Sequence, residues 1–279
     1  MIVMKILTLN CHSLEEENYQ DKLLEFAQWT AKEKPDIVAL QEVNQSIEAK
    51  AVSLETAEGF TSDEKDLILK SDNHAYNLAK LLSELGYPMY WTWTPAKIGY
   101  GKYQEGLAIF SSMPFKKTTQ RYTTHSKEFE NWKVRKALSA ICDVNGKEMQ
   151  FVTVHMGWWE DKEEPFTDQW ESLEKIVEKN MKCFVMGDFN SPASVSGGGY
   201  DYITAKGWKD TYNLAEIKDE GYTVCKKIDG WKDKDTDGKM RIDFIFTNEN
   251  TNVEKSVVVF NGTNGNVVSD HYGVMITLK

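Results

Sequence analysis

Seven short apolar segments, spread over the whole chain, each end in or beside a polar side chain suited to metal or phosphate. They read TLNCH, ALQEV, YQEGLAIF, FVTVHMGWW, FVMGDFN, RIDFIF and SDHYGV. Their polar residues are Asn10, Glu42, Tyr103, Glu105, His155, Asp188, Asn190, Asp243, Asp270 and His271. A strand holds a side chain at its end with little positional freedom, so strand ends are good mounts for catalytic groups. Oxygen donors with an imidazole beside them predict one cation site.

The motifs come from both halves of the chain, so the two halves must meet at this site. No repeat, low-complexity tract or linker divides the 279 residues, and a chain of this length can bury a large core. We therefore predict an α/β fold in a single domain over residues 1–279. In it, two mixed sheets pack face to face and helices lie outside.

Hydrophobic periodicity predicts helices over residues 18–33, 72–85 and 165–180. Strands are predicted in the runs MKILTLNC and DIVALQEV, and then near residues 88–94, 105–111, 134–144, 149–155, 182–187, 240–247, 253–260 and 272–278. Residues 45–71 and 193–200 look added to this framework, as a long polar loop and a Gly-rich loop. DKDTDG at 233–238 resembles the opening of an EF-hand loop but lacks its closing Glu, so we predict a polar turn.

The seven motifs in this order resemble the endonuclease/exonuclease/phosphatase superfamily, which includes deoxyribonuclease I and exonuclease III. The resemblance runs from Asn10 to His271, nearly the whole chain. Each motif alone is common, whereas all of them in order at this spacing are not. The resemblance implies a four-layer α/β sandwich, and it implies a phosphoester hydrolase that depends on Mg²⁺ or Mn²⁺.

The resemblance assigns Glu42, Asn10 and Asp270 to the cation. Without the other motifs, a Glu at this point would be an ordinary surface residue at a loop start. Asp188 and Asn190 lie two apart, and alternation along an extended segment puts both on one face. The family role of Asp188 is to orient and deprotonate the attacking water, while Asn190 holds the phosphate or the water. The alternative for this pair is a turn.

Two further groups are implied by the same resemblance. Asp243 and His271 resemble the family's carboxylate–imidazole pair, in which the carboxylate fixes the tautomer and raises the basicity of the ring. Tyr103 and Glu105 lie two apart on one strand and so share a face. The resemblance suggests that Glu105 orients His155, and that His155 protonates the leaving group or binds phosphate.

Four residues are candidate substrate contacts. A guanidinium meets phosphate through paired hydrogen bonds, so Arg135 is a candidate clamp, with an ordinary surface Arg as the alternative. Trp158 and Trp159 come shortly after His155 in HMGWW and are predicted to form a substrate wall, although a single Trp is more often core. His12 stands where exonuclease III-like members tend to have an acidic residue, so its role and the number of cations stay open.

Charge and hydropathy narrow the class of substrate. Net charge is −10, from 33 basic and 43 acidic residues, whereas proteins that grip a phosphate backbone usually present a basic face. No run approaches the ~18 apolar residues of a membrane span, and no secretory signal is recognised. These features favour a cytoplasmic protein that acts on a small phosphate ester, without a membrane partner and with nucleic acid disfavoured. They leave the oligomeric state open.

Within the superfamily, the pieces LNCHS, WTW, IGYGKYQEGLAIFS and HMGWW look most like the group of bacterial maltose 6′-phosphate phosphatases. The predicted reaction is therefore attack of water on the phosphorus of a sugar phosphate. Three alternatives remain. A nuclease should have a basic groove, a sphingomyelinase should carry an exposed apolar loop, and a non-catalytic binding protein should have lost a motif residue.

Overall fold

The strands of the protein form two sheets, which a computed structural model describes over residues 3–225 and 238–279. The larger sheet has the order β10-β12-β13-β1-β2-β4-β3. Its strands are β1 (Met4–Asn10), β2 (Ile37–Ser46), β3 (Tyr90–Gly99), β4 (Tyr103–Ser111), β10 (Ile217–Lys218), β12 (Val253–Val259) and β13 (Gly273–Leu278). The smaller sheet has the order β5-β6-β7-β8-β11-β9. Its strands are β5 (Phe115–Tyr122), β6 (Lys136–Val144), β7 (Lys147–His155), β8 (Lys182–Asp188), β9 (Lys209–Asp210) and β11 (Asp243–Thr247).

Successive side chains in the central strands face different apolar layers. In β1, Ile6 packs in the layer between the two sheets, whereas Leu7 packs on the outer face of the larger sheet. In β8, Phe184 packs between the sheets and Val185 on the outer face of the smaller sheet. Because both faces of each sheet are buried, these strands are near-continuous apolar runs, as the sequence has them.

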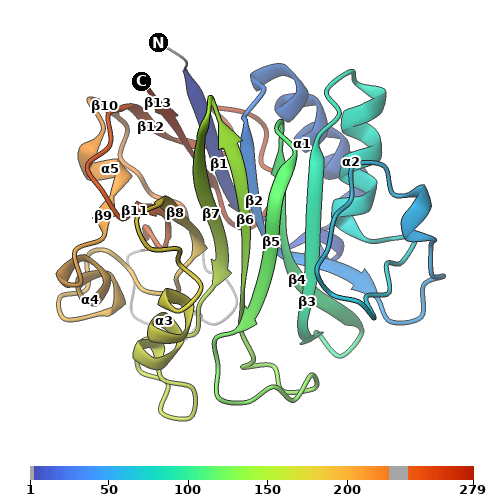
Figure 1. Ribbon diagram of the computed structural model, residues 1–279, viewed down its shortest axis with the longest axis horizontal. Coiled ribbons are helices and arrows are strands. Elements are labelled where there is room, and N and C mark those ends of the chain that lie inside the picture. The colour runs from blue at the N-terminus through green and yellow to red at the C-terminus, as the bar shows by residue number, and fades with distance from the viewer. Residues whose placement is uncertain (1–2, 226–237) are drawn as a thin grey trace.

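Helices cover the outer faces of both sheets (Figure 1). Phe26 and Leu78 bring the first two helices onto the larger sheet, while Trp170 and Ile203 bring the next two onto the smaller one. These helices are α1 (Tyr19–Glu33), α2 (His74–Glu84), α3 (Phe166–Glu174) and α4 (Gly199–Ala205). Short helices α5 (Thr211–Leu214), η1 (Ser13–Glu15) and η2 (Leu54–Thr56) lie in connections. The layer order confirms the predicted four-layer α/β sandwich. No helix in the described ranges is long and apolar enough to cross a membrane.

Two predicted helix ends differ from the observed ones, and at both places side chains form hydrogen bonds with backbone groups. Helix α2 begins at His74 because the Asn73 side chain caps it, accepting a hydrogen bond from Tyr76 N at 3.0 Å. Helix α3 ends well before residue 180. There the Gln150 side chain of β7 bonds the carbonyl of Ile176 and the N–H of Glu178, so this stretch is tied to the sheet. Strand β5 was not predicted, because its polar sequence FKKTTQRY shows little apolar alternation.

Residues 45–71 are anchored to the body of the protein. The Gln45 side chain accepts hydrogen bonds from Lys70 N and Asn73 Nδ2, and Leu67 and Leu69 are buried in the layer under α2. The segment lies beside α2 and β3 at the right of Figure 1. The Gly-rich residues 193–200 lead into α4. The polar turn predicted at 233–238 lies outside the described residues, apart from Gly238.

Candidate active site

Strand pairing brings the polar strand ends together at one edge of the sandwich. Strands β1 and β2 are parallel, with Asn10 opposite Gln41, and β7 and β8 are parallel, with His155 opposite Asp188. On the other side of β8, Asp188 pairs with Asp243 of β11. Ends of parallel strands meet at the same sheet edge. Asp188 therefore lies between the imidazole of β7 and the carboxylate of β11.

A bulge in β2 turns Glu42 into this site. Gln41 points between the sheets, where its Nε2 donates to Thr153 Oγ1 of β7 at 2.8 Å. Alternation would send Glu42 to the opposite face. Instead, Glu42 has a φ of 53° and the pairing of β2 with β4 shifts register around it. Its Oε1 consequently accepts a hydrogen bond from Asn10 Nδ2 at 2.9 Å. Bulges commonly re-aim a side chain beside an active site.

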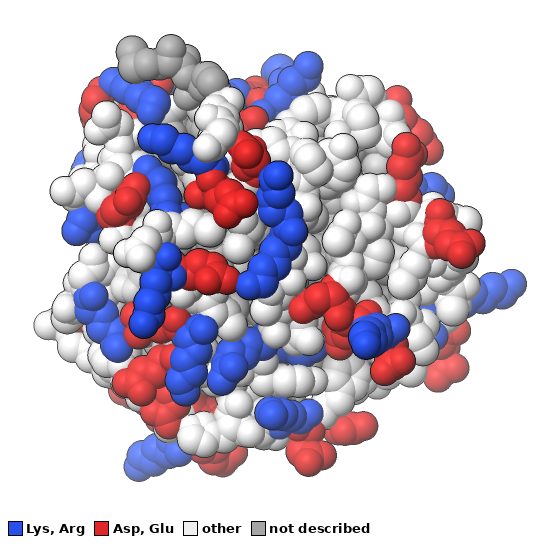
Figure 2. All heavy atoms as spheres, in the orientation of Figure 1, with Lys and Arg blue, Asp and Glu red and all other residues white. Residues whose placement is uncertain are grey.

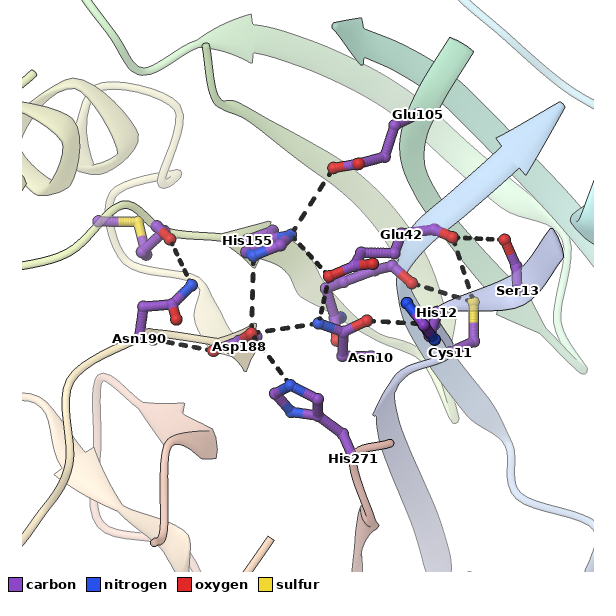
Figure 3. Close-up of polar contacts among 12 residues, drawn as sticks. Asn10, Cys11, His12, Ser13, Glu42, Glu105, His155, Asp188, Asn190 and His271 are labelled. Carbon is purple, nitrogen blue, oxygen red and sulfur yellow. Dashed lines mark hydrogen bonds and ion pairs between the residues drawn. The ribbon is translucent and has the colours of Figure 1, made fainter. Parts of the chain in front are cut away.

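Asp188 is the buried centre of the polar network (Figure 3). Its Oδ1 accepts from the backbone N–H of Asn190 at 2.8 Å, and its Oδ2 accepts from Asn10 Nδ2 at 3.1 Å. The Nε2 atoms of His155 and His271 lie 3.6 and 3.8 Å from the same Oδ2. Burial raises the pKa of Asp188, the charge of His271 opposes that shift, and Asp243 adds to it.

His271 is held by Asp243, as the sequence predicts for this pair. Its Nδ1 lies 3.0 and 3.2 Å from the two carboxylate oxygens of Asp243. Burial alone would lower the pKa of His271, but the charges of Asp243 and Asp188 outweigh burial and hold the pKa well above its usual value. The ring is therefore protonated near neutral pH and faces Asp188 with its other nitrogen.

Glu105 has a closer partner than the one the sequence suggested. Its Oε1 lies 3.1 Å from Lys97 Nζ, whereas His155 Nδ1 is 4.0 Å away. Burial, together with the charges of Arg135 and Lys97, holds the pKa of His155 well below its usual value. His155 is thus a neutral imidazole in this arrangement, and Glu105 is mainly the counterion of Lys97.

Oxygen ligands from three separate segments of the chain face a common space. Glu42, Asp188 and Asp270 all line one pocket, and Asn10 bonds the first two. Burial, then the charges of Glu105 and Asp270, raise the pKa of Glu42. Glu42 Oε2 is buried and has no hydrogen-bond partner in the described parts of the chain. A crowded set of carboxylate and amide oxygens with one oxygen left over fits a hard divalent cation.

The pocket has a volume of about 390 Å³, and nitrogen donors and aromatic rings form its other side. Three buried nitrogen atoms here, Arg135 Nε, His155 Nδ1 and Trp158 Nε1, have no hydrogen-bond partner among the residues the structure describes. Trp132 and Tyr100 complete this wall, and Trp132 meets Trp158 edge to face at 5.7 Å between ring centroids. The pocket thus offers acceptors to a cation and donors to an anion.

Two predicted residues are not brought to the pocket. The Tyr103 hydroxyl donates to Leu14 O at 3.2 Å, and Tyr100 lines the pocket in its place. Trp159 packs against Phe166, with ring centroids 5.6 Å apart, on the α3 side of the smaller sheet. Asn190, by contrast, lines the pocket. Its Nδ2 donates a hydrogen bond to the Met156 carbonyl at 3.0 Å.

His12 lies beside the pocket. Its Nδ1 is 2.8 Å from Glu16 Oε1 and 3.9 Å from Asp270 Oδ1, and its Nε2 is 3.2 Å from the Tyr100 hydroxyl. Burial opposes protonation, but the hydrogen bond with Glu16 and the charge of Asp270 raise the pKa of His12 to about 9. In this arrangement the ring pairs with Glu16, and His12, Glu16 and Asp270 also lie close enough together to hold a metal ion.

Sequence reasoning missed Lys97 and Tyr100 and did not select Trp132. Lys97 is 6% exposed and lines the pocket from β3, after a register shift between Pro95 and Lys97. Pro inside a strand pattern often marks a bulge, so Pro95 was the one local signal for an unusual neighbour. Trp132 is 54% exposed at the pocket, in the connection between β5 and β6.

Comparison with known proteins gives both a family and a shared fold. A sequence model of the endonuclease/exonuclease/phosphatase family matches residues 7–271. No curated protein matches the chain. Among solved structures, an endonuclease/exonuclease/phosphatase family protein from Leptotrichia buccalis is 32% identical, covers 99% of each chain and has a TM-score of 0.87.

Two more distant structures share the fold. A mannosyl-6-phosphatase from Bacteroides thetaiotaomicron is 18% identical over 98% of each chain, with a TM-score of 0.65. TDP2 from D. rerio, complexed with a single-stranded DNA product, is 15% identical over 99% of each chain, with a TM-score of 0.63. At these identities the likeness concerns the fold alone.

Proposed function

The chain belongs to the endonuclease/exonuclease/phosphatase family, a family of metal-dependent phosphoester hydrolases, and from this premise we propose that it is a phosphomonoesterase acting on a soluble sugar phosphate. We take residues 1–279 as one catalytic domain. Water attacks phosphorus, and the products are the sugar and inorganic phosphate. Maltose 6′-phosphate is the first substrate to test, because the segments around Tyr100 and Trp158 resemble phosphatases of that sugar. A mannosyl-6-phosphatase of the same fold supports the substrate class.

The observation that supports this proposal most is the composition of the pocket wall. Carboxylates lie on one part of it, buried unpartnered donors on another, and the indole rings of Trp132 and Trp158 on a third. A phosphate ester needs a cation and donors around its oxygens. Sugar rings pack well on flat indole faces. A pocket of about 390 Å³ accommodates a small ester, in the size range of small-molecule sites.

The donor set fits Mg²⁺ or Mn²⁺. Glu42, Asn10 and Asp270 would hold the ion, because they supply only oxygen donors and the buried Glu42 Oε2 lacks a partner in the described chain. When bound, such an ion polarises a phosphoryl oxygen as a Lewis acid and neutralises charge. Burial, and after it the charges of Glu105 and Asp270, raise the pKa of Glu42, and the ion would relieve that repulsion.

Asp188 is proposed as the general base. Its raised pKa brings it nearer to neutral pH, where a base takes a proton most effectively. The Asn190 N–H and Asn10 Nδ2 fix its two oxygens, so the carboxylate cannot rotate away from a water in the pocket. The protonated ring of His271 lies 3.8 Å from Asp188 Oδ2 and favours the ionised carboxylate, the form that can accept a proton.

His155 and Arg135 are proposed to contact the phosphate and the leaving oxygen. His155 is neutral and its Nδ1 has no hydrogen-bond partner in the described residues, so one ring N–H is available to the ester. Arg135 offers its buried Nε from the same wall. Trp158 is near both Arg135, whose guanidinium carbon is 5.9 Å from the ring centroid, and Trp132. We expect the Trp158 ring to pack against the sugar of the substrate.

A nuclease is the main competing function, since TDP2 shares the fold and was solved with single-stranded DNA. The charge of the protein argues against a nuclease. The chain carries a net charge of −10, and Figure 2 shows Lys and Arg interspersed with Asp and Glu over the face drawn. A strand-binding groove normally presents a basic track.

The test is phosphate release from a panel of soluble metabolites with Mg²⁺ or Mn²⁺, with plasmid DNA and a sphingomyelin substrate in parallel. We expect a disaccharide phosphate such as maltose 6′-phosphate to be hydrolysed while the DNA stays intact. Nicked DNA with untouched sugar phosphates would establish a nuclease and overturn the proposal. Asp188→Ala, expected to lower hydrolysis by about 10³-fold or more, is the control for contaminating phosphatase.

A further inference from the structure

Two buried cations in the pocket wall share one carbonyl oxygen. Lys97 Nζ donates to Trp132 O at 3.0 Å, and Arg135 Nη1 donates to the same oxygen at 3.4 Å. Lys97 is 6% exposed and Arg135 is 3% exposed, and both line the pocket. Like charges in a buried site repel each other, so a fold that holds two of them side by side must gain something from both.

Of these two cations, only Lys97 has a carboxylate at ion-pair distance among the described residues. Glu105 lies 3.1 Å from Lys97 Nζ. In the described ranges, no carboxylate lies within ion-pair distance of Arg135, and Lys97 has no second one. A buried charge without a partner is costly. Arg135 thus lacks a direct carboxylate partner, and the charges of Glu105, Asp188 and Glu42 favour its charged form from farther away.

Donor atoms on this wall are also left over. An ammonium group has three N–H bonds, and Lys97 uses two, toward Glu105 and Trp132, within the described parts of the chain. Arg135 Nε and Trp158 Nε1 are buried and likewise lack partners there. Buried donors in native proteins are normally satisfied. Three donors and two cationic side chains around one pocket describe a receptor for an oxyanion.

We propose that Lys97, together with Arg135, binds the terminal oxygens of a phosphate monoester dianion, and that Lys97 thereby selects monoesters against diesters. The inference rests on the proposed function and adds the basis of its specificity. A phosphate monoester carries close to two negative charges near pH 8, because its second pKa is about 6. A diester carries one charge and replaces a terminal oxygen by a second alkoxy group. The third oxygen and the extra charge are what Lys97 would recognise.

The size of the effect follows from the position of Lys97. One additional negative charge about 5 Å from a buried ammonium, at an effective dielectric constant of about 20, favours the dianion by about 10²-fold. Loss of Lys97 should therefore lower kcat/KM about 10²-fold more for a monoester than for a diester, because the monoester loses the attraction of one additional charge. A merely structural role would lower both equally.

The experiment compares Lys97→Gln with the wild-type protein on p-nitrophenyl phosphate and bis(p-nitrophenyl) phosphate at pH 8 with Mg²⁺. The matched control is Lys133→Gln, because Lys133 follows Trp132 in the chain but pairs with Asp161 and Glu163 and does not line the pocket. We expect the monoester-to-diester ratio to fall about 10²-fold in Lys97→Gln and to stay unchanged in the control. Equal losses on both substrates in Lys97→Gln would overturn the inference.

A second measurement covers the case in which Lys97→Gln fails to fold with Glu105 left unpaired. Inorganic phosphate and dimethyl phosphate are compared as inhibitors of the wild-type protein at pH 8. The dianion is expected to inhibit at a concentration lower by about tenfold or more, and equal inhibition would overturn the inference. A wild-type protein that cleaves diesters or DNA but no monoester would overturn the proposed function as well. Monoesterase activity with an unchanged ratio would overturn only the role of Lys97.

Discussion

Replacement of Asp243 by Asn tests the pair it forms with His271. Both carboxylate oxygens lie within hydrogen-bond distance of His271 Nδ1, at 3.0 and 3.2 Å, and both side chains are buried. Loss of a hydrogen bond to a charged group costs about 1.5–3 kcal/mol, which is about 10- to 150-fold in rate. Asn also removes the charge that keeps the ring protonated, and its N–H₂ can impose the wrong tautomer. In the Asp–His pair of serine proteases this substitution costs about 10⁴-fold. We therefore expect kcat to fall between about 10² and 10⁴-fold.

The assay is steady-state hydrolysis with Mg²⁺ for Asp243→Asn, His271→Ala and the double variant. Residues that act as one unit are non-additive, so the double variant should be no more than about threefold slower than His271→Ala. The matched control is Asp168→Asn, because Asp168 pairs with His125 at 2.8 Å on the surface. That variant should keep the wild-type rate. A loss below tenfold in Asp243→Asn, or multiplicative losses in the double variant, would refute the proposed pair.

Three further predictions concern the cation, the sugar and acid stability. Glu42→Gln keeps the side-chain size but removes the charge, so the Mg²⁺ concentration for half-maximal activity should rise about tenfold or more; an unchanged titration excludes Glu42 as a ligand. Trp158→Ala should raise KM for maltose 6′-phosphate about tenfold more than for p-nitrophenyl phosphate, and equal effects would mean that Trp158 only packs. Burial lowers the pKa of His74 to about 3, so below about pH 6.5 the unfolded chain binds a proton that the folded protein does not. That group alone should lower the free energy of unfolding by about 2 kcal/mol from pH 6.5 to 5, a loss absent in His74→Gln when urea unfolding is compared at both pH values.

Much of the fold was predictable because its signals are local. A strand buried on both faces reads as a continuous apolar run, so β1, β2, β7 and β8 are visible in the sequence. Their ends are equally visible, which is why Asn10, His155 and Asp188 could be singled out before any pairing was known. The pairing of one strand with another, by contrast, has no local signal in the sequence. The parallel register that puts His155 opposite Asp188 follows from the packing of the whole sandwich.

The donor wall was mostly hidden from sequence reasoning. Lys97 sits in a strand otherwise filled with apolar and Thr side chains, and its two partners lie on other segments, Glu105 on β4 and Trp132 in the connection before β6. No residue close to Lys97 in the sequence indicates that Glu105 or Trp132 is its partner. Trp158 and Trp159 are adjacent and equal in type, yet only the first reaches the pocket. The direction of the backbone after β7 determines which of the two Trp side chains reaches the pocket.

Residues with strained backbone conformations also cluster at the candidate active site. Glu42, Asn190, His12 and Tyr100 all have a positive φ, at 53°, 47°, 49° and 52°. Asn tolerates this conformation, whereas each of the others gives up roughly 1 kcal/mol or more of stability. A straight β2 would avoid that cost but would turn Glu42 toward the apolar outer layer under α1 and α2. The fold therefore accepts strain at the positions where the side chain must face the pocket. Local propensity rules fail at Glu42 because the site, and not the strand, sets its conformation.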